Sequence, residues 1–209
     1  MAHGTAHGGE KLQKQTGRLE AFSDGVFAIA ITLLALDLKV PHVTPSSPDL
    51  ASALLAQWPS YFAFITSFFT VLIMWVHHHL IFRLVHRTDF RLLFANGLLL
   101  MLVTVVPFPT AVVAEYLRTP AAPSAVTLYA GVFVLISVAF CLVLMAAFRP
   151  SILDPDASRT AVARIRRDYR WGPPLYSAAA VAAPFSPWLA MGICAGLWIF
   201  WALTTRSVD

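Results

Sequence analysis

Residues 125–148 form an unbroken run without a single charged side chain. At 1.5 Å per residue, a helix of about 20 residues crosses the roughly 30 Å hydrocarbon core of a bilayer. The composition agrees, because 58% of the chain is hydrophobic and only 12% is charged, against about 25% charged residues in soluble domains. Lipid can cover this much apolar surface, so the sequence predicts an integral membrane protein built from helices.

Further apolar segments, bounded by charges or turn residues, predict an all-α fold with six transmembrane helices. The predicted helices span residues 18–39, 50–78, 90–116, 125–148, 168–184 and 187–204. They form one domain, 18–204, between a flexible tail, 1–17, and a short tail, 205–209. The last two helices are short, because Pro184-Phe-Ser-Pro187 is typical of a tight turn. Pro107 and Pro109 predict a kink in the third helix.

Basic residues are distributed unequally between the two ends of these helices. With six helices, Lys39 and Arg118 fall on one side of the membrane. The other 13 of the 15 Lys and Arg residues fall on the side of the termini. The 13 are Lys11, Lys14, Arg18, Arg83, Arg87, Arg91, Arg149, Arg159, Arg164, Arg166, Arg167, Arg170 and Arg206. The positive-inside rule then places both termini in the cytoplasm, with the chain in the inner, or plasma, membrane. These loops account for the net charge of +4, so we expect no nucleic-acid partner.

The polar connection 149–170 carries its own pattern. Arg159, Ala163, Arg166 and Arg170 fall on one helical stripe, which predicts an amphipathic helix at the cytoplasmic membrane surface. Cys141 and Cys194 both lie in apolar spans without CxxC spacing, so disulfide and metal roles are not expected.

The first helix has two distinct faces when placed on a wheel at 100° per residue. Phe22, Gly25, Ile29, Thr32, Leu33 and Leu36 gather on one face, and Asp24, Ala28, Ile31 and Ala35 gather on nearly the opposite one. Small residues let a neighbouring helix approach closely, so we expect the second face to pack within the subunit. The first face is left for lipid, a symmetry mate or a pore.

Asp24 is an acid near the cytoplasmic end of this helix. An ionisable group inside a membrane segment is costly and usually paired, so Arg18, His77 and Asn96 are candidate partners at the same depth. Asp24 could instead simply complement the helix dipole, and Ser23 could be an N-cap.

In Trp75-Val-His-His-His79, three consecutive histidines cannot all face one way. One buried histidine with two exposed is a simpler interpretation than a metal site, and a pH-sensitive network lies between the two.

Arg18-Leu-Glu-Ala-Phe22-Ser23-Asp24, which opens the first membrane helix, resembles the Arg-x-x-x-Phe-Ser-Asp signature of the transmembrane protein 175 family. This family comprises the endolysosomal potassium channels and shorter bacterial relatives. The run that continues to Asp37 is similar to the bacterial form. Trp75-x-His77-His78 and Asn96 also look like family features, although Trp75 matches less closely as a functional residue.

The resemblance implies a homotetrameric, potassium-permeable channel in which four copies of the first helix line the pore. Ile29 then matches a hydrophobic constriction, Thr32 a ring linked to potassium preference, and Leu33 and Leu36 further apolar layers. Arg18, Phe22, Ser23, Asp24, His77 and Asn96 match the signature and a polar network that supports the pore helix. The implied site uses no cofactor or structural metal, and its ligand is K⁺ in transit with modest preference over Na⁺. The pore positions coincide with the face that the wheel leaves free.

Three functions of different classes remain to be weighed. The leading one is a passive potassium-permeable channel. A proton-coupled or proton-conducting transporter could use Asp24 and His77 as a relay, but no charge lies at the bilayer midplane. An enzyme or structural subunit is disfavoured, since no nucleophile–base pair, phosphate loop or metal constellation is found in the sequence.

Overall fold

The computed structural model describes residues 4–41 and 49–205, with side chains for 16–41 and 49–204. This part of the chain is helical apart from its turns and one isolated antiparallel bridge between Val85 and Leu153. The elements are α1 (Gly4–Leu34), η1 (Ala35–Asp37), α2 (Leu50–Ala56), α3 (Trp58–Phe82), α4 (Phe90–Val105), α5 (Pro107–Tyr116), α6 (Ala122–Ala147), α7 (Arg159–Tyr169), α8 (Gly172–Ala182) and α9 (Pro187–Thr205).

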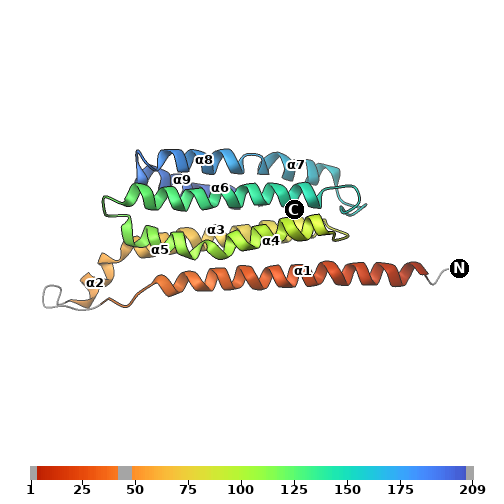
Figure 1. Cartoon of the computed structure of the whole chain (residues 1–209), viewed down its shortest axis with the longest axis horizontal. Helices are drawn as coiled ribbons and strands as arrows, with labels where there is room; N and C mark the ends of the chain where they lie inside the picture. Colours follow the sequence, from red (N-terminus) through yellow and green to blue (C-terminus); the bar gives the residue numbers. More distant parts are fainter. Residues whose placement is uncertain (1–3, 42–48, 206–209) are drawn as a thin grey trace.

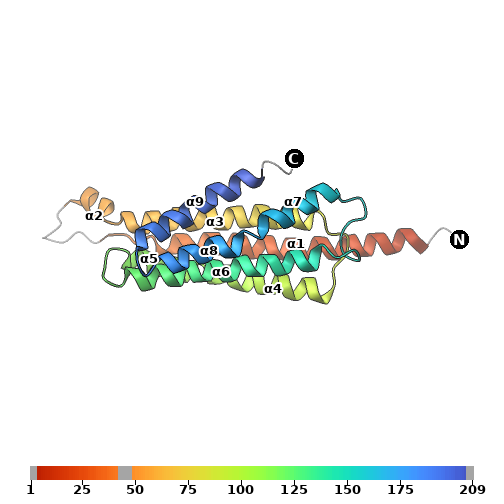
Figure 2. The same cartoon turned by 90° about the horizontal axis from the view of Figure 1, so that it is seen from above.

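The helices run along one common axis in layers (Figures 1 and 2). α1 forms one edge, α3 with the α4–α5 pair forms the next layer, and α6 and α7–α9 lie beyond it (Figure 1). α6 is the centre of the packing and contacts α4, α5, α8 and α9. Its large buried side chains include Tyr129, Phe133 and Ile136. By contrast, α1 contacts chiefly α3 and α4, so one side of it has no neighbouring helix among the described residues.

The buried stripe of α1 differs from the expected one. Ser23, Phe27, Ala30 and Leu34 are each 1% exposed or less, whereas Ala28 and Ala35 are exposed. The first four positions lie within about 60° of one another on a helical wheel, and they meet α3 and α4. The prediction that Asp24, Ala28, Ile31 and Ala35 form the packing face was therefore wrong for Ala28 and Ala35, whereas Asp24 and Ile31 are partly buried and contact the rest of the subunit. Those residues lie between the buried stripe and the free face.

Several boundaries also differ from the predicted ones. α1 begins at Gly4, so the described segment 4–17 is helical and continuous with the first membrane helix, and its flexibility stays a prediction; residues 1–3 and 206–209 lie outside the described residues. The predicted helix 50–78 is two helices that meet at Gln57, and Pro59 follows in the first turn of α3. The kink predicted at Pro107 and Pro109 coincides with an interruption at Val106, after which Pro107 begins α5.

The segment after α6 contains the amphipathic helix that the sequence predicts. α7 buries Val162, Ile165 and Tyr169 and leaves Arg166 and Arg170 exposed. α8 begins after a short turn at Arg170 and Trp171, so the predicted helix 168–184 is divided between the end of α7 and α8. The turn 183–186 separates α8 from α9. Within the described residues, five helices are long and apolar enough to cross a membrane, and α8, with 11 residues, is not among them.

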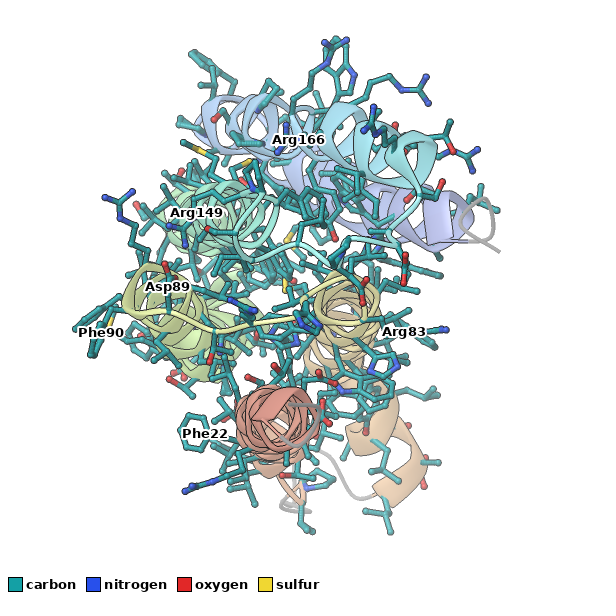
Figure 3. The ribbon with its side chains drawn as sticks, turned by 90° about the vertical axis from the view of Figure 1, so that its right-hand side faces the viewer. Phe22, Arg83, Asp89, Phe90, Arg149 and Arg166 are labelled. Carbon is teal, nitrogen blue, oxygen red and sulfur yellow. The ribbon has the colours of Figure 1, made fainter. Side chains whose placement is uncertain are left out.

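The loop between α3 and α4 and the loop between α6 and α7 are joined by backbone hydrogen bonds. The amide of His86 donates to the carbonyl of Ile152, and the amide of Asp154 donates to that of Leu84. Arg149, just after α6, forms an ion pair with Asp89, the N-cap of α4 (Figure 3). The hydrogen bond from Arg149 holds the pKa of the Asp89 carboxyl below its usual value, and the bond from the Leu92 amide adds to this. This pair therefore fixes the start of α4 against the end of α6.

Candidate pore face and its polar support

The free face of α1 is apolar and uncharged. The exposed fractions are 63% for Phe22, 57% for Ile29, 39% for Leu33 and 74% for Leu36, and Thr32 is also exposed. In Figure 3 Phe22 points outward from α1, on the same side of the bundle as Phe90 of α4. A row of large apolar side chains of this size is either covered by lipid or by another copy of the chain. The assignment of Ile29, Thr32, Leu33 and Leu36 to a pore remains a prediction.

A directional chain of hydrogen bonds holds the opposite side of α1. The Ser23 hydroxyl donates to the Leu19 carbonyl at 2.8 Å, so its oxygen accepts from Asn96 Nδ2 at 2.9 Å. Asn96 Oδ1 is then the acceptor for His78 Nε2 at 2.8 Å. Because an amide oxygen cannot donate, Nε2 of His78 must carry a proton. All three side chains are buried, so α1, α3 and α4 are joined by one satisfied polar network.

Asp24 has a different partner from those predicted. Trp75 Nε1 donates to Asp24 Oδ1 at 2.8 Å, which links α1 to α3 beside the Ser23–Asn96–His78 chain. Arg18 is exposed and lines a surface hollow with Phe22 and Phe90. Asp24 is thus paired within the subunit, as expected, but the expected partners Arg18, His77 and Asn96 were wrong. Trp75, the residue considered the less certain match, is the one that bonds to it.

The three consecutive histidines face three ways. His77 is buried on the far side of α3, where Nε2 lies 3.1 Å from the Trp201 carbonyl and the ring meets Tyr169 and Trp201 edge-on. His78 is buried toward α1 and α4, and His79 is exposed and stacks on Trp75. Two of the three histidines are therefore buried, whereas the simpler interpretation of the sequence had one buried and two exposed. His77 thus lies outside the network, and His78 is the network residue that sequence reasoning missed.

A helical wheel could have identified His78. His78 and His79 stand three and four positions after Trp75 and flank it within about 60° on either side, whereas His77 points about 200° away from Trp75. A rotation of this helix that turns Trp75 toward the first helix therefore turns His78 toward the first helix as well. No group of three His, Cys, Asp or Glu side chains in the described residues could hold a metal ion. These contacts define a helical membrane protein in which one helix is fastened to the bundle on one side and bare on the other.

Known proteins share this architecture. The family model described as the endosomal/lysosomal potassium channel TMEM175 matches residues 18–107. A potassium channel of Chamaesiphon minutus is 52% identical over 197 residues, 93% of this chain and 97% of its own length. One of Streptomyces collinus is 49% identical over 156 residues, 73% of this chain and 75% of its own. The human endosomal/lysosomal proton channel TMEM175 is 36% identical over 118 residues, 53% of this chain and 23% of the human protein.

A solved structure agrees with these relatives. The crystal structure of a lysosomal potassium-selective channel TMEM175 homolog from Chamaesiphon minutus matches with a TM-score of 0.83 and 50% identity, over 91% of this chain and 97% of that one. The chain belongs to the TMEM175 family. It is therefore a multi-pass membrane protein of an ion-channel family and not an enzyme, as the signature at Arg18–Asp24 predicted.

Proposed function

We propose that this chain is the subunit of a homotetrameric, potassium-permeable channel that conducts passively through a pore lined by α1. The observation that carries the proposal is the asymmetry of α1. Its buried side is fixed by Ser23, Phe27 and Leu34, while Ile29 and Leu36 on the other side are more than half exposed. A helix that is rigidly supported from behind can hold an apolar ring in register around a four-fold axis. The bacterial relatives are named potassium channels.

Ile29 and Thr32 have complementary parts in this pore. Ile29 is β-branched and therefore stiff in a helix, and a narrow ring of such side chains blocks ions by dewetting. The Thr32 hydroxyl donates to the Ile29 carbonyl at 2.9 Å, so its proton is occupied and its oxygen lone pairs are free to face a cation. Four such oxygens favour a partly dehydrated K⁺ only modestly over Na⁺, since they do not form a full carbonyl cage.

The proposed orientation has both termini in the cytoplasm, with the channel in the inner, or plasma, membrane. It rests on the 13 basic residues that the six-helix topology puts on the side of the termini. An impermeant maleimide added from outside should label a cysteine at exposed Ala121 and not one at exposed Pro155, in a chain that lacks Cys141. Labelling in the opposite pattern would reverse the orientation.

Proton conduction is the second candidate, because the animal relatives are named proton channels. The hydrogen bonds in this chain do not favour a relay. The Ser23–Asn96–His78 chain ends on the Leu19 carbonyl, which cannot pass a proton on, and Asp24 is held by an indole N–H. Among the described residues, Asp24 and His77 share no hydrogen bond. A potassium pathway along the bare face of α1 needs none of these groups to titrate.

Flux through the purified protein in liposomes tests the proposal. An outward K⁺ gradient should drive uptake of a reporter cation, a Na⁺ gradient should drive less, and an imposed pH gradient alone should drive almost none. Transport that follows the pH gradient and ignores the K⁺ gradient would support the proton alternative instead. Empty liposomes and liposomes with heat-inactivated protein are the controls.

A further inference from the structure

The exposed arginines of α7 border two neighbouring surface hollows. One hollow, of about 490 Å³, is lined largely by arginine, including Arg159, Arg166 and Arg170. The second, of about 360 Å³, shares Arg166 and Arg170 but is otherwise lined mainly by Leu144, Met145 and other residues of α6 and α7. A basic hollow therefore adjoins an apolar one, with the same two guanidinium groups between them. The α7 layer is the one farthest from α1, as the position of Arg166 in Figure 3 shows.

The apolar hollow opens onto a bare strip of α6. Leu135, Val138, Leu142 and Met145 follow one another at spacings of three and four residues, and their exposed fractions are 54%, 42%, 40% and 70%. Residues with this spacing share one face of a helix. The strip therefore runs along the bundle axis away from Arg166 and Arg170, in the direction that an acyl chain takes from its headgroup.

The arginines differ in how far they are already engaged. Arg166 donates one hydrogen bond to the Phe148 carbonyl at 2.7 Å, and its guanidinium lies 5.7 Å from the centre of the Phe148 ring. This contact holds the side chain in place and uses one of five N–H donors. Arg167 is bonded to Asp168, and Arg170 lies over the Trp171 ring. Arg166 and Arg170, four residues apart, thus present an anchored pair of donors suited to a phosphate.

We propose that the junction of α6 and α7 binds an anionic phospholipid, with its phosphate between Arg166 and Arg170 and an acyl chain along the exposed strip of α6. Charge complementarity and the adjoining apolar strip favour a lipid over a soluble anion, which would use only the basic hollow. Basic loops that merely set orientation need no apolar strip beside them. This site lies on the opposite side of the bundle from the free face of α1 and is independent of the pore.

Equilibrium binding of fluorescent phosphatidylglycerol to the purified full-length protein in detergent tests this site. The double variant Arg166→Gln/Arg170→Gln should weaken binding about 30-fold, because each arginine near the surface contributes about 1 kcal/mol and 1.4 kcal/mol is tenfold. The matched control is Arg83→Gln/Arg87→Gln, which removes two exposed charges from the α3–α4 loop and should change binding less than threefold. Equal losses in both variants would overturn the site.

Two further measurements keep the test decisive. Since Arg166 also donates to the Phe148 carbonyl, Arg170→Glu alone serves if the double variant fails to fold, and it too should weaken the preference for phosphatidylglycerol over phosphatidylcholine. The deacylated headgroup, glycerophosphoglycerol, and inorganic phosphate should compete at least 100-fold less well than the intact lipid. Competition by either at the same concentration as the lipid would mean that the hollow binds a free anion, and would contradict the proposal.

Discussion

Asn96 Nδ2 and Ser23 Oγ lie 2.9 Å apart across the interface between α4 and α1, and both side chains are buried. The bond fixes the rotation of α1 about its own axis, because Ser23 can reach Asn96 from only one side of the helix. With Ser23 turned inward, Ile29 and Leu36 necessarily turn outward. The hydrogen bond between Ser23 and Asn96, six residues before Ile29, therefore determines which side of α1 is left exposed.

Removal of the central amide should loosen α1. Asn96→Ala leaves Ser23 and His78 without their shared partner, and a buried group that loses its partner costs about 1–3 kcal/mol. The thermal midpoint of the detergent-solubilised protein should fall clearly. Gly97→Ala is the neighbouring control, since an added Cβ there meets nothing within 4 Å and alanine raises helix propensity by about 1 kcal/mol. A midpoint for Asn96→Ala at or above that of wild type would show that the network does not support α1.

The bond between Trp75 and Asp24 should behave as a coupled pair. Trp75→Phe keeps an aromatic ring and removes the indole donor, while Asp24→Ala removes the acceptor. Each should reduce stability or assembly by about 1–3 kcal/mol before it alters ion selectivity. Because both remove the same bond, the double variant should cost less than the sum of the two. Additive losses would show that the two side chains are not coupled. A fully assembled Asp24→Ala channel with changed selectivity would place Asp24 toward the ions instead.

Acid should weaken the connection between α4 and α6. The pKa of Asp89 is lowered from its ordinary value of 3.8, first by the hydrogen bond from Arg149. The stabilisation is therefore complete above the ordinary pKa and is lost as pH falls through the lower pKa of the folded state. Both side chains are partly exposed, 35% for Asp89 and 26% for Arg149, so solvent screening limits the effect to about 0.2–1 kcal/mol.

Asp89→Asn isolates this effect. Asparagine is as good an N-cap as aspartate, so the bond to the Leu92 amide can persist while the charge is lost. The thermal midpoint of Asp89→Asn should fall less between pH 6 and pH 3 than that of the wild type. Asp156→Asn, at an exposed site, should show the same fall in thermal midpoint as the wild type. An unchanged profile in Asp89→Asn would mean that other groups cause the acid sensitivity.

The sequence predicted the bare face of α1 but not the packed one. The bare face is recognisable because Ile29, Thr32 and Leu36 form an uncharged stripe at helical spacing. The packed face was placed on Asp24, Ala28, Ile31 and Ala35 by the rule that small residues allow close approach, but Ala28 and Ala35 are exposed. In the structure Phe27 and Leu34 fill the interface instead, with Ala30 between them. Packing depends on the shape of the surfaces that neighbouring helices present to each other. This shape cannot be read from a single sequence.

The polar support was predicted in part for a similar reason. Ser23 and Asn96 belong to the network, but His77 was chosen where His78 acts. The composition of α3 does not say how the helix is rotated toward α1. That rotation is set by contacts far apart in the sequence, such as His77 against Trp201 of α9. The break at Pro107 was predictable, because proline lacks the amide hydrogen that a continuous helix needs.

The central claim is that Ile29 forms the narrowest point of a pore made by α1. Single-channel recording of Ile29→Asn tests it directly, beside Val181→Asn as a control that is also β-branched and, at 68%, similarly exposed. A polar ring removes the dewetting barrier, so Ile29→Asn should raise the conductance several-fold and Val181→Asn should leave it unchanged. Unaltered conductance in a well-assembled Ile29→Asn channel would remove Ile29 from the pore and contradict the assignment of α1 as the pore helix.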